Sequence, residues 1–230
     1  KANMASAGTI SVRLAHKGRS YAWITARNVQ ERYGFLRRNL SRLATDPTVG
    51  AIKADQAKRS PLLFPVAVIE DLARQRHDLV PAKRATSRLG IPPGGVADLA
   101  RIGLVTRASG PVLRLVDGDL YYTSSSITAF EAKVRACAGS PAPHSLIRLS
   151  AAVKQLGPGE RPWAAIVTSI LEGRLPVYPL PDTGGPFIAQ LGVPDLGHLV
   201  AIAAAADAAH VGGDDRISFK EAGDIIGAGQ

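Results

Sequence analysis

The sequence predicts a mainly α-helical fold with small β-hairpins, built from a short unit that occurs several times along the chain. Three observations support this fold class. A short pattern ending in glycine recurs, an apolar stripe with helical spacing follows each glycine, and an extended apolar run follows each stripe. Self-similarity of this kind is typical of repeated architectures, in which each copy is one supersecondary unit.

The recurring glycine pattern predicts the first helix of each copy. A small or aliphatic residue is followed four positions later by an aliphatic or aromatic one, and glycine comes next. Residues four positions apart share one helix face, and a glycine after a helix adopts the left-handed conformation that ends it. Thr25 is an N-cap candidate for the first copy. The copies are Val29, Tyr33 and Gly34, then Ala85, Leu89 and Gly90, then Ala152, Leu156 and Gly157, and finally Ala222, Ile226 and Gly227.

A second helix is predicted after each of the first three glycines. Apolar residues recur there at a spacing of three or four, which indicates a helix that packs on the first one. The stripes are Leu40 and Leu43, then Val96 and Leu99, then Trp163, Ile166 and Ile170.

Extended apolar runs predict β-hairpins at about 50–64, 111–122 and 177–189, each about thirty residues past a glycine. In the second copy the run Val112–Leu115 precedes Asp117 and Gly118, and Asp-Gly between apolar runs is a strong hairpin signal. A closing helix is predicted after each run. The runs and the helix residues are Leu62–Phe64 with Ile69 and Leu72, Leu120–Tyr122 with Ile127 and Phe130, and Phe187–Ile188 with Leu196 and Leu199.

The predicted organisation is three full copies and the start of a fourth. Residues 1–76 hold the first copy, and strand-like segments at 9–14 and 21–24 precede it, which we interpret as the wing of a preceding copy. The second copy covers 80–138, the third and more degenerate one 146–210, and 217–230 begin a truncated fourth. Pro, Gly and Ser at 139–144 and Gly and Asp at 212–215 predict linkers.

A helix, a turn, a second helix and a β-hairpin form a winged helix-turn-helix, so the fold class is mainly α with small β-hairpin wings, in tandem units. The short Ala-x-x-x-Leu-Gly first helix resembles the excisionase and MerR-like group. Segments 149–157 and 170–175 are similar to segments that recur in the C-terminal part of TniQ-type transposition proteins. The resemblance implies DNA binding. Such proteins usually carry cysteine-rich zinc motifs too, which Cys137, the one cysteine, cannot supply.

The charge is distributed unevenly. The net charge is +9, yet residues 1–110 hold 19 Lys and Arg against 7 Asp and Glu, whereas residues 111–230 hold 9 against 12. A strong basic excess favours polyanionic partners. The first half is therefore the predicted nucleic-acid-binding part, and double-stranded DNA is the predicted partner.

The second helix of the first copy carries the predicted DNA-reading residues. In a helix-turn-helix this helix enters the major groove, where Arg can pair with guanine and Asn with adenine. A merely solvated basic face is the alternative. Cations of the predicted wing would meet phosphate or the minor groove, and the cations of the second copy suit phosphate better than bases. The helix residues are Arg37, Arg38, Asn39, Ser41 and Arg42, the wing residues Lys53, Lys58 and Arg59, and those of the second copy Lys83, Arg84, Arg88, Arg107 and Arg114.

The second helix of the third copy, around residues 163–170, is almost purely apolar. A helix hydrophobic on all sides is normally buried. We expect it to pack on another copy or a partner, so the C-terminal half is predicted to bind other protein subunits. Cys137 continues the helical pattern of Phe130 and Val134 and is predicted to be a small buried hydrophobe.

No catalytic set emerges from the sequence. The five histidines are scattered, no phosphate-binding Gly-Lys-Ser/Thr loop occurs, and a single cysteine cannot form an internal disulfide or a multi-cysteine metal site. No apolar stretch is long enough to cross a bilayer. We therefore expect a non-enzymatic protein with no cofactor, metal or membrane contact, in the bacterial cytoplasm and associated with the nucleoid.

The predicted function is sequence-specific binding of double-stranded DNA in transposition, recombination or transcription regulation. Two alternatives stay open. One is a protein-interaction adaptor of a DNA-processing complex with little direct DNA contact, and the other is an enzyme of unfamiliar type. The salt dependence of DNA affinity separates DNA binding from both alternatives, because phosphate contacts make affinity fall steeply with salt.

Overall fold

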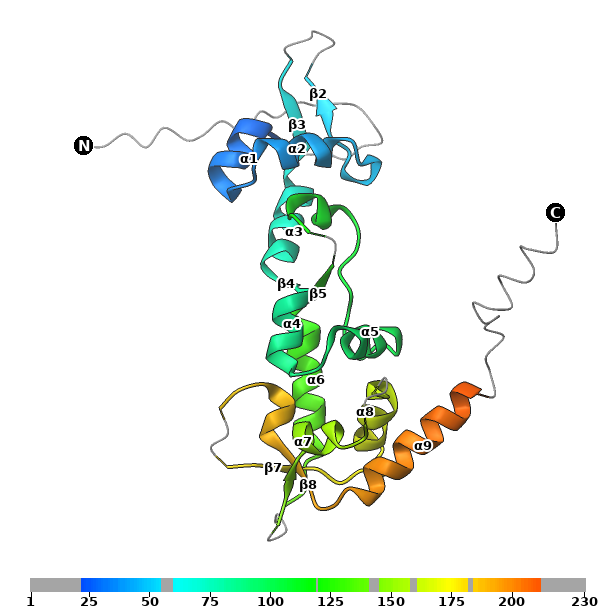
Figure 1. The fold of residues 1–230 in the computed structure, drawn as a ribbon. Helices are drawn as coiled ribbons and strands as arrows, with labels where there is room; N and C mark the ends of the chain where they lie inside the picture. The colour runs from blue at the N-terminus through cyan, green and yellow to red at the C-terminus, as the bar shows by residue number, and fades with distance from the viewer. Residues whose placement is uncertain are drawn as a thin grey trace, which may run out of the picture. The chain divides into compact units, whose positions relative to one another are not determined.

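The computed structural model describes residues 22–54, 60–118, 120–140, 145–157, 161–181 and 184–211 (Figure 1). This part of the chain is mainly helical, with nine α-helices and three small antiparallel sheets, as the sequence predicts. The described residues form two compact units. Residues 22–85 and 105–128 make up the first, and residues 86–104 and 129–211 make up the second.

The first copy of the pattern folds as a strand, two helices, a hairpin and a closing helix. The central strand of its sheet, β3 (Leu62–Pro65), pairs antiparallel with both of the others. The hairpin predicted at 50–64 is therefore present. The elements are β1 (Trp23–Thr25), α1 (Ala26–Tyr33), α2 (Arg37–Ala44), the 3-10 turn η1 (Pro47–Val49), β2 (Ile52–Lys53), β3 (Leu62–Pro65) and α3 (Val66–His77).

Residues 22–24, the described part of the segment 21–24, do not belong to the wing of a preceding copy, so that interpretation is wrong for them. Ile24 in β1 lies opposite Phe64 in β3, so the strand closes the sheet of its own copy. The physical reason is burial: Trp23 and Ile24 are both buried, and pairing with β3 provides hydrogen-bond partners for the backbone of this buried strand.

Among the described residues of the second copy, the first strand of the hairpin predicted at 111–122 is absent, and Tyr122 instead forms an antiparallel bridge with Arg107. Val112–Leu115 is part of a 3-10 turn instead of a strand, and β5 pairs with β4 (Val80 opposite Tyr122). In the 3-10 turn Val112 and Leu115 lie three positions apart, on one side, and both are buried. The elements are β4 (Leu79–Pro81), α4 (Ala82–Leu89), α5 (Pro93–Arg101), η2 (Pro111–Leu115), β5 (Tyr121–Thr123) and α6 (Ser124–Ala136).

The third copy has an antiparallel pair near the predicted position, with Tyr178 opposite Gly192. The expected strand at Phe187–Ile188 is wrong, because these residues form a 3-10 turn after Pro186 and the strand starts at Leu191. The elements are β6 (Ile147–Arg148), α7 (Leu149–Lys154), α8 (Trp163–Leu171), β7 (Tyr178–Pro179), η3 (Phe187–Gln190), β8 (Leu191–Val193) and α9 (Gly197–Val211).

The three stretches share one order of elements: a strand, two helices, a late strand and a closing helix. In each stretch the late strand pairs antiparallel with the strand before the first helix, as β3 with β1, β5 with β4 and β8 with β6. The predicted glycine stops at Gly34 and Gly90 are confirmed, whereas the one at Gly157 is wrong, because α7 already ends at Lys154 and two turn residues precede the glycine. Gly34, Gly90 and Gly157 have φ of 65°, 74° and 99°, a left-handed conformation that favours glycine.

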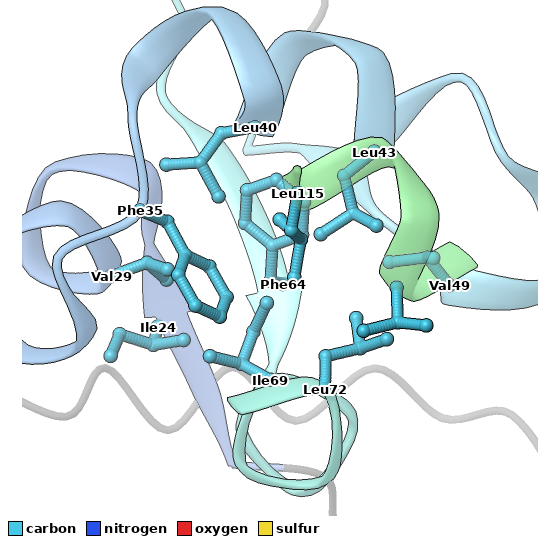
Figure 2. Packing of buried hydrophobic residues seen from close by; sticks show 11 residues of the cluster. Ile24, Val29, Phe35, Leu40, Leu43, Val49, Phe64, Ile69, Leu72 and Leu115 are labelled. Atoms are coloured by element: carbon cyan, nitrogen blue, oxygen red, sulfur yellow. The ribbon is translucent and has the colours of Figure 1, made fainter. Parts of the chain in front are cut away.

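The core of the first compact unit joins both copies that contribute to it (Figure 2). Leu115 of η2 reaches the same cluster as Leu43 of α2 and Phe64 of β3. The 3-10 turn η2 therefore packs on α2 and α3. The cluster is Ile24, Val29, Phe35, Leu40, Leu43, Val49, Phe64, Ile69, Leu72, Val112 and Leu115.

In the second compact unit, α8 is buried as the sequence predicts, and it packs against α5 and α9. The prediction that Cys137 is buried is wrong. Cys137 is exposed, because α6 ends at Ala136 and the cysteine follows in a turn. The predicted strand at 9–14 and the fourth copy at 217–230 lie outside the described residues. None of the described helices is long and apolar enough to cross a membrane.

Candidate nucleic-acid interface

Helix α2 has one buried face and one exposed, cationic face. Leu40 and Leu43 are buried in the core, whereas Arg37, Arg38, Ser41 and Arg42 are exposed. Residues four positions apart lie side by side on a helix, so Arg38 and Arg42 form one row and Arg37 and Ser41 the next. We call these four exposed residues the cationic face of α2.

A groove of about 480 Å³ runs beside this face. It is bounded by the start of α1, by α2 and by the residues that lead into β3, and its described lining includes two arginines and no carboxylate. Arg27 forms an exposed ion pair with Glu31 (2.9 Å), one turn further along α1. The lining residues are Thr25, Ala26, Arg27, Gln30, Arg37, Leu40, Ser41, Ser60, Pro61 and Leu62.

Local sequence fixes the entry to α1 at the edge of this groove. The Thr25 side chain accepts a hydrogen bond from the backbone N–H of Asn28 (3.2 Å), as the sequence predicts for an N-cap. The cap fixes the first turn of α1, which carries Arg27. Because Val29 is buried in the core, Arg27 and Gln30 are directed toward the outside of the unit, at the groove.

An acidic residue lies against the other side of the cationic face. Asp117 follows η2, and its carboxylate lies 2.6 Å from Nη2 of Arg38 and 4.0 Å from Nη1 of Arg42. All three side chains are largely exposed, so solvent screens these ion pairs and each stabilises the fold by no more than about 1 kcal/mol.

A second ion pair fixes η2 to the first copy. Nε of Arg114 lies 3.0 Å from Oδ2 of Asp46, the residue that caps η1. The Thr48 hydroxyl donates a hydrogen bond to the Asp46 carboxylate, and this bond, together with Arg114 and the Thr48 backbone N–H, lowers the pKa of Asp46. Asp46 is therefore held in its charged form.

Asn39 is not on the exposed face, which corrects its predicted placement. It is buried, and its Nδ2 donates a hydrogen bond to the backbone carbonyl of Leu115 (3.0 Å). The reason is that η2 packs on the side of α2 that the sequence pattern leaves to solvent. The Asn39 amide is therefore committed to the contact between α2 and η2 and is not presented to a base edge.

The other predicted cations are spread over several elements. Lys53 in β2 is exposed, and so are Lys83 and Arg84 at the start of α4 and Arg107 before β5. Lys58 and Arg59 lie outside the described residues. None of the described cations of the second copy lines the groove.

Arg88 is committed to an ion pair, which the sequence prediction did not foresee. It approaches Glu131 of α6 with two nitrogens, Nε at 2.8 Å and Nη2 at 2.9 Å. The Glu131 side chain is only 10% exposed, and the hydrogen bond to it raises the pKa of Arg88. A buried carboxylate requires such a partner, so Arg88 is assigned to the fold and not to phosphate.

Three residues of this interface were missed at the level of sequence. Arg27 and Gln30 could have been found, because they follow the predicted N-cap on the first helix, which in the helix-turn-helix that the sequence predicts would cross the DNA backbone. Asp117 could not have been found, because its proximity to Arg38 depends on the packing of η2 against α2. Among the described residues no group of three or more His, Cys, Asp and Glu side chains is arranged to hold a metal ion.

No protein-family model matches the chain, and neither a curated protein nor a solved structure is significantly similar to it. The geometry of the site therefore carries the functional argument.

Proposed function

We propose that this protein binds double-stranded DNA through the cationic face of α2 and the adjoining groove, and that its three copies are winged helix-turn-helix units. The observation that carries the proposal is the arrangement of Arg37, Arg38 and Arg42 on one exposed side of a helix whose other side is buried. An α-helix fits the major groove, and arginine pairs with guanine or with phosphate.

The groove suggests how α2 is oriented on the DNA. Arg27 and Arg37 line it, and the described lining contains no carboxylate, although Arg27 is paired with Glu31 (2.9 Å) beside the groove, so both arginines suit the phosphates of one strand. Arg38 and Arg42 lie one row further around α2 and suit base edges. Phosphate contacts would position the helix, and base contacts would provide sequence preference.

The proposed biological setting is transposition, recombination or transcription control, in which tandem units read a composite site. The alternative, an adaptor with little direct DNA contact, rested partly on the apolar helix α8. That helix packs on α5 and α9 of the same chain, so it is no longer an argument for a partner surface. Binding of other subunits by the C-terminal half stays a prediction.

The test is a charge reversal of the cationic face, Arg37→Glu, Arg38→Glu and Arg42→Glu together. Binding of a labelled duplex of about 30 base pairs is measured by fluorescence anisotropy at several salt concentrations. We expect a loss of at least about 100-fold, since each arginine contact contributes about 1–3 kcal/mol. Circular dichroism should stay native, because none of the three is a core residue.

The matched control is Arg101→Glu, Arg148→Glu and Arg174→Glu, three exposed cations of the second compact unit. This control variant changes the net charge by the same amount as the first variant. We expect its DNA affinity to fall by less than about fivefold, through long-range electrostatics alone. Equal losses in both variants, or native affinity in the first, would contradict the proposed interface.

A further inference from the structure

Asp117 is held beside α2 by contacts on both sides of it in the chain. Two residues before it, Leu115 is buried in the core and its carbonyl accepts the hydrogen bond from Asn39. Tyr121, four residues later, donates its hydroxyl hydrogen to the backbone carbonyl of Asp117. These contacts before and after Asp117 fix its position beside α2.

The Asp117 carboxylate occupies the place that a bound anion would take. Arg38 and Arg42 are one turn apart on α2, and the carboxylate contacts the first at 2.6 Å and approaches the second at 4.0 Å. Carboxylate and phosphate are bound by guanidinium groups through the same charge-assisted geometry. A phosphate that binds Arg38 through Nη2 would therefore displace Asp117.

We propose that Asp117 is a specificity-determining residue: it competes with DNA phosphate for Arg38 and Arg42 and weakens binding to duplexes of arbitrary sequence. This inference rests on the proposed function. A duplex that offers only phosphates gains little from displacing the carboxylate. A duplex that also offers suitable base edges gains contacts that the carboxylate cannot provide. Asp117 thereby widens the gap between specific and non-specific affinity.

The opposite role would be positioning, in which Asp117 holds Arg38 in the conformation needed for a guanine. The two roles predict changes of opposite sign. Loss of a competitor tightens binding to any duplex, whereas loss of a positioning residue weakens it.

The experiment compares wild type with Asp117→Asn in the full chain, with a labelled random-sequence duplex of about 30 base pairs as the probe. Asparagine keeps the shape and removes the charge. We expect affinity to rise about three- to tenfold and the salt dependence to become steeper, because one or two more arginines reach phosphates. The control is Asp71→Asn, which removes another exposed charge, paired with Arg74 on α3, and should change affinity less than twofold.

Each result decides a separate question. Unchanged or weaker binding by Asp117→Asn, with salt-dependent binding by wild type, overturns the competitor role and leaves the proposed function intact. Equal gains in Asp117→Asn and Asp71→Asn also overturn it, because net charge would then explain both. A wild type that fails to bind the duplex at the lowest salt overturns the proposed function itself.

Discussion

Gly95 in α5 lies directly against the indole of Trp163 in α8. A Cβ built at position 95 would come within 2.7 Å of Cγ of Trp163, closer than real Cβ atoms approach. The missing side chain therefore permits the close contact of the two helices. These are the second helices of the second and third copies, and they bury apolar residues against each other instead of presenting a cationic face as α2 does.

Gly95→Ala should destabilise the second compact unit by about 1–3 kcal/mol, the usual cost of overpacking a well-filled contact. This cost outweighs the higher helix propensity of alanine, which contributes about 1 kcal/mol at most. The neighbouring Gly94→Ala is the control, since a Cβ there meets nothing within 4 Å and should be neutral or stabilising. Urea denaturation measures both, and an equal rise of the two midpoints would contradict the packing argument.

Asn39→Ala should lower stability by about 1–2 kcal/mol, because the buried Leu115 carbonyl loses its hydrogen bond donor. Base preference of the folded protein should be unchanged, since the amide lies inside. Thermal unfolding measures the first effect and selection from a randomised duplex pool the second. An altered preference at one base pair with unchanged stability would restore Asn39 as a base-reading residue.

Arg88→Met should destabilise the protein by about 2 kcal/mol, because it leaves the Glu131 carboxylate without its bidentate partner. The cost is below that of a fully buried pair, since Arg88 is itself 37% exposed and solvent screens it. Arg84→Met, one turn earlier on α4, is the control and should cost less than about 0.5 kcal/mol. Equal stabilities in urea would show that the ion pair contributes nothing.

Stability should fall in acid partly through Asp46. Its pKa is lowered in the folded state, first by the Thr48 hydroxyl and then by Arg114, so the charged form stabilises the fold above the ordinary pKa near 4. That stabilisation is lost as pH falls from about 4 through the folded-state pKa. In Asp46→Asn the melting temperature should be lower at pH 6, and the difference from wild type should shrink toward pH 2.5.

An NMR titration of the Asp46 carboxyl provides the direct check. Thr48→Val removes the strongest hydrogen bond to it and should raise its pKa toward the ordinary value. A Thr48→Val protein whose Asp46 titrates as in wild type would contradict the assigned cause.

Local patterns determined most of the helices. The core positions Leu40, Leu43, Val96 and Leu99, and the glycine stop at Gly34, follow from helical periodicity and from the backbone freedom of glycine, which act over a few residues. The cationic side of α2 follows from the same periodicity, since residues between core positions face outward. A basic first half and an apolar α8 are likewise properties of the sequence itself.

Only the tertiary structure decided which partners these elements meet. Val112 and Leu115 have the composition of a strand, but burial against α2 and α3 stabilises a 3-10 turn there instead. That docking buries Asn39 and brings Asp117 to Arg38, two residues 79 positions apart in the chain. Hydrophobic burial is non-directional and depends on what lies nearby in space, so no window of sequence contains that information.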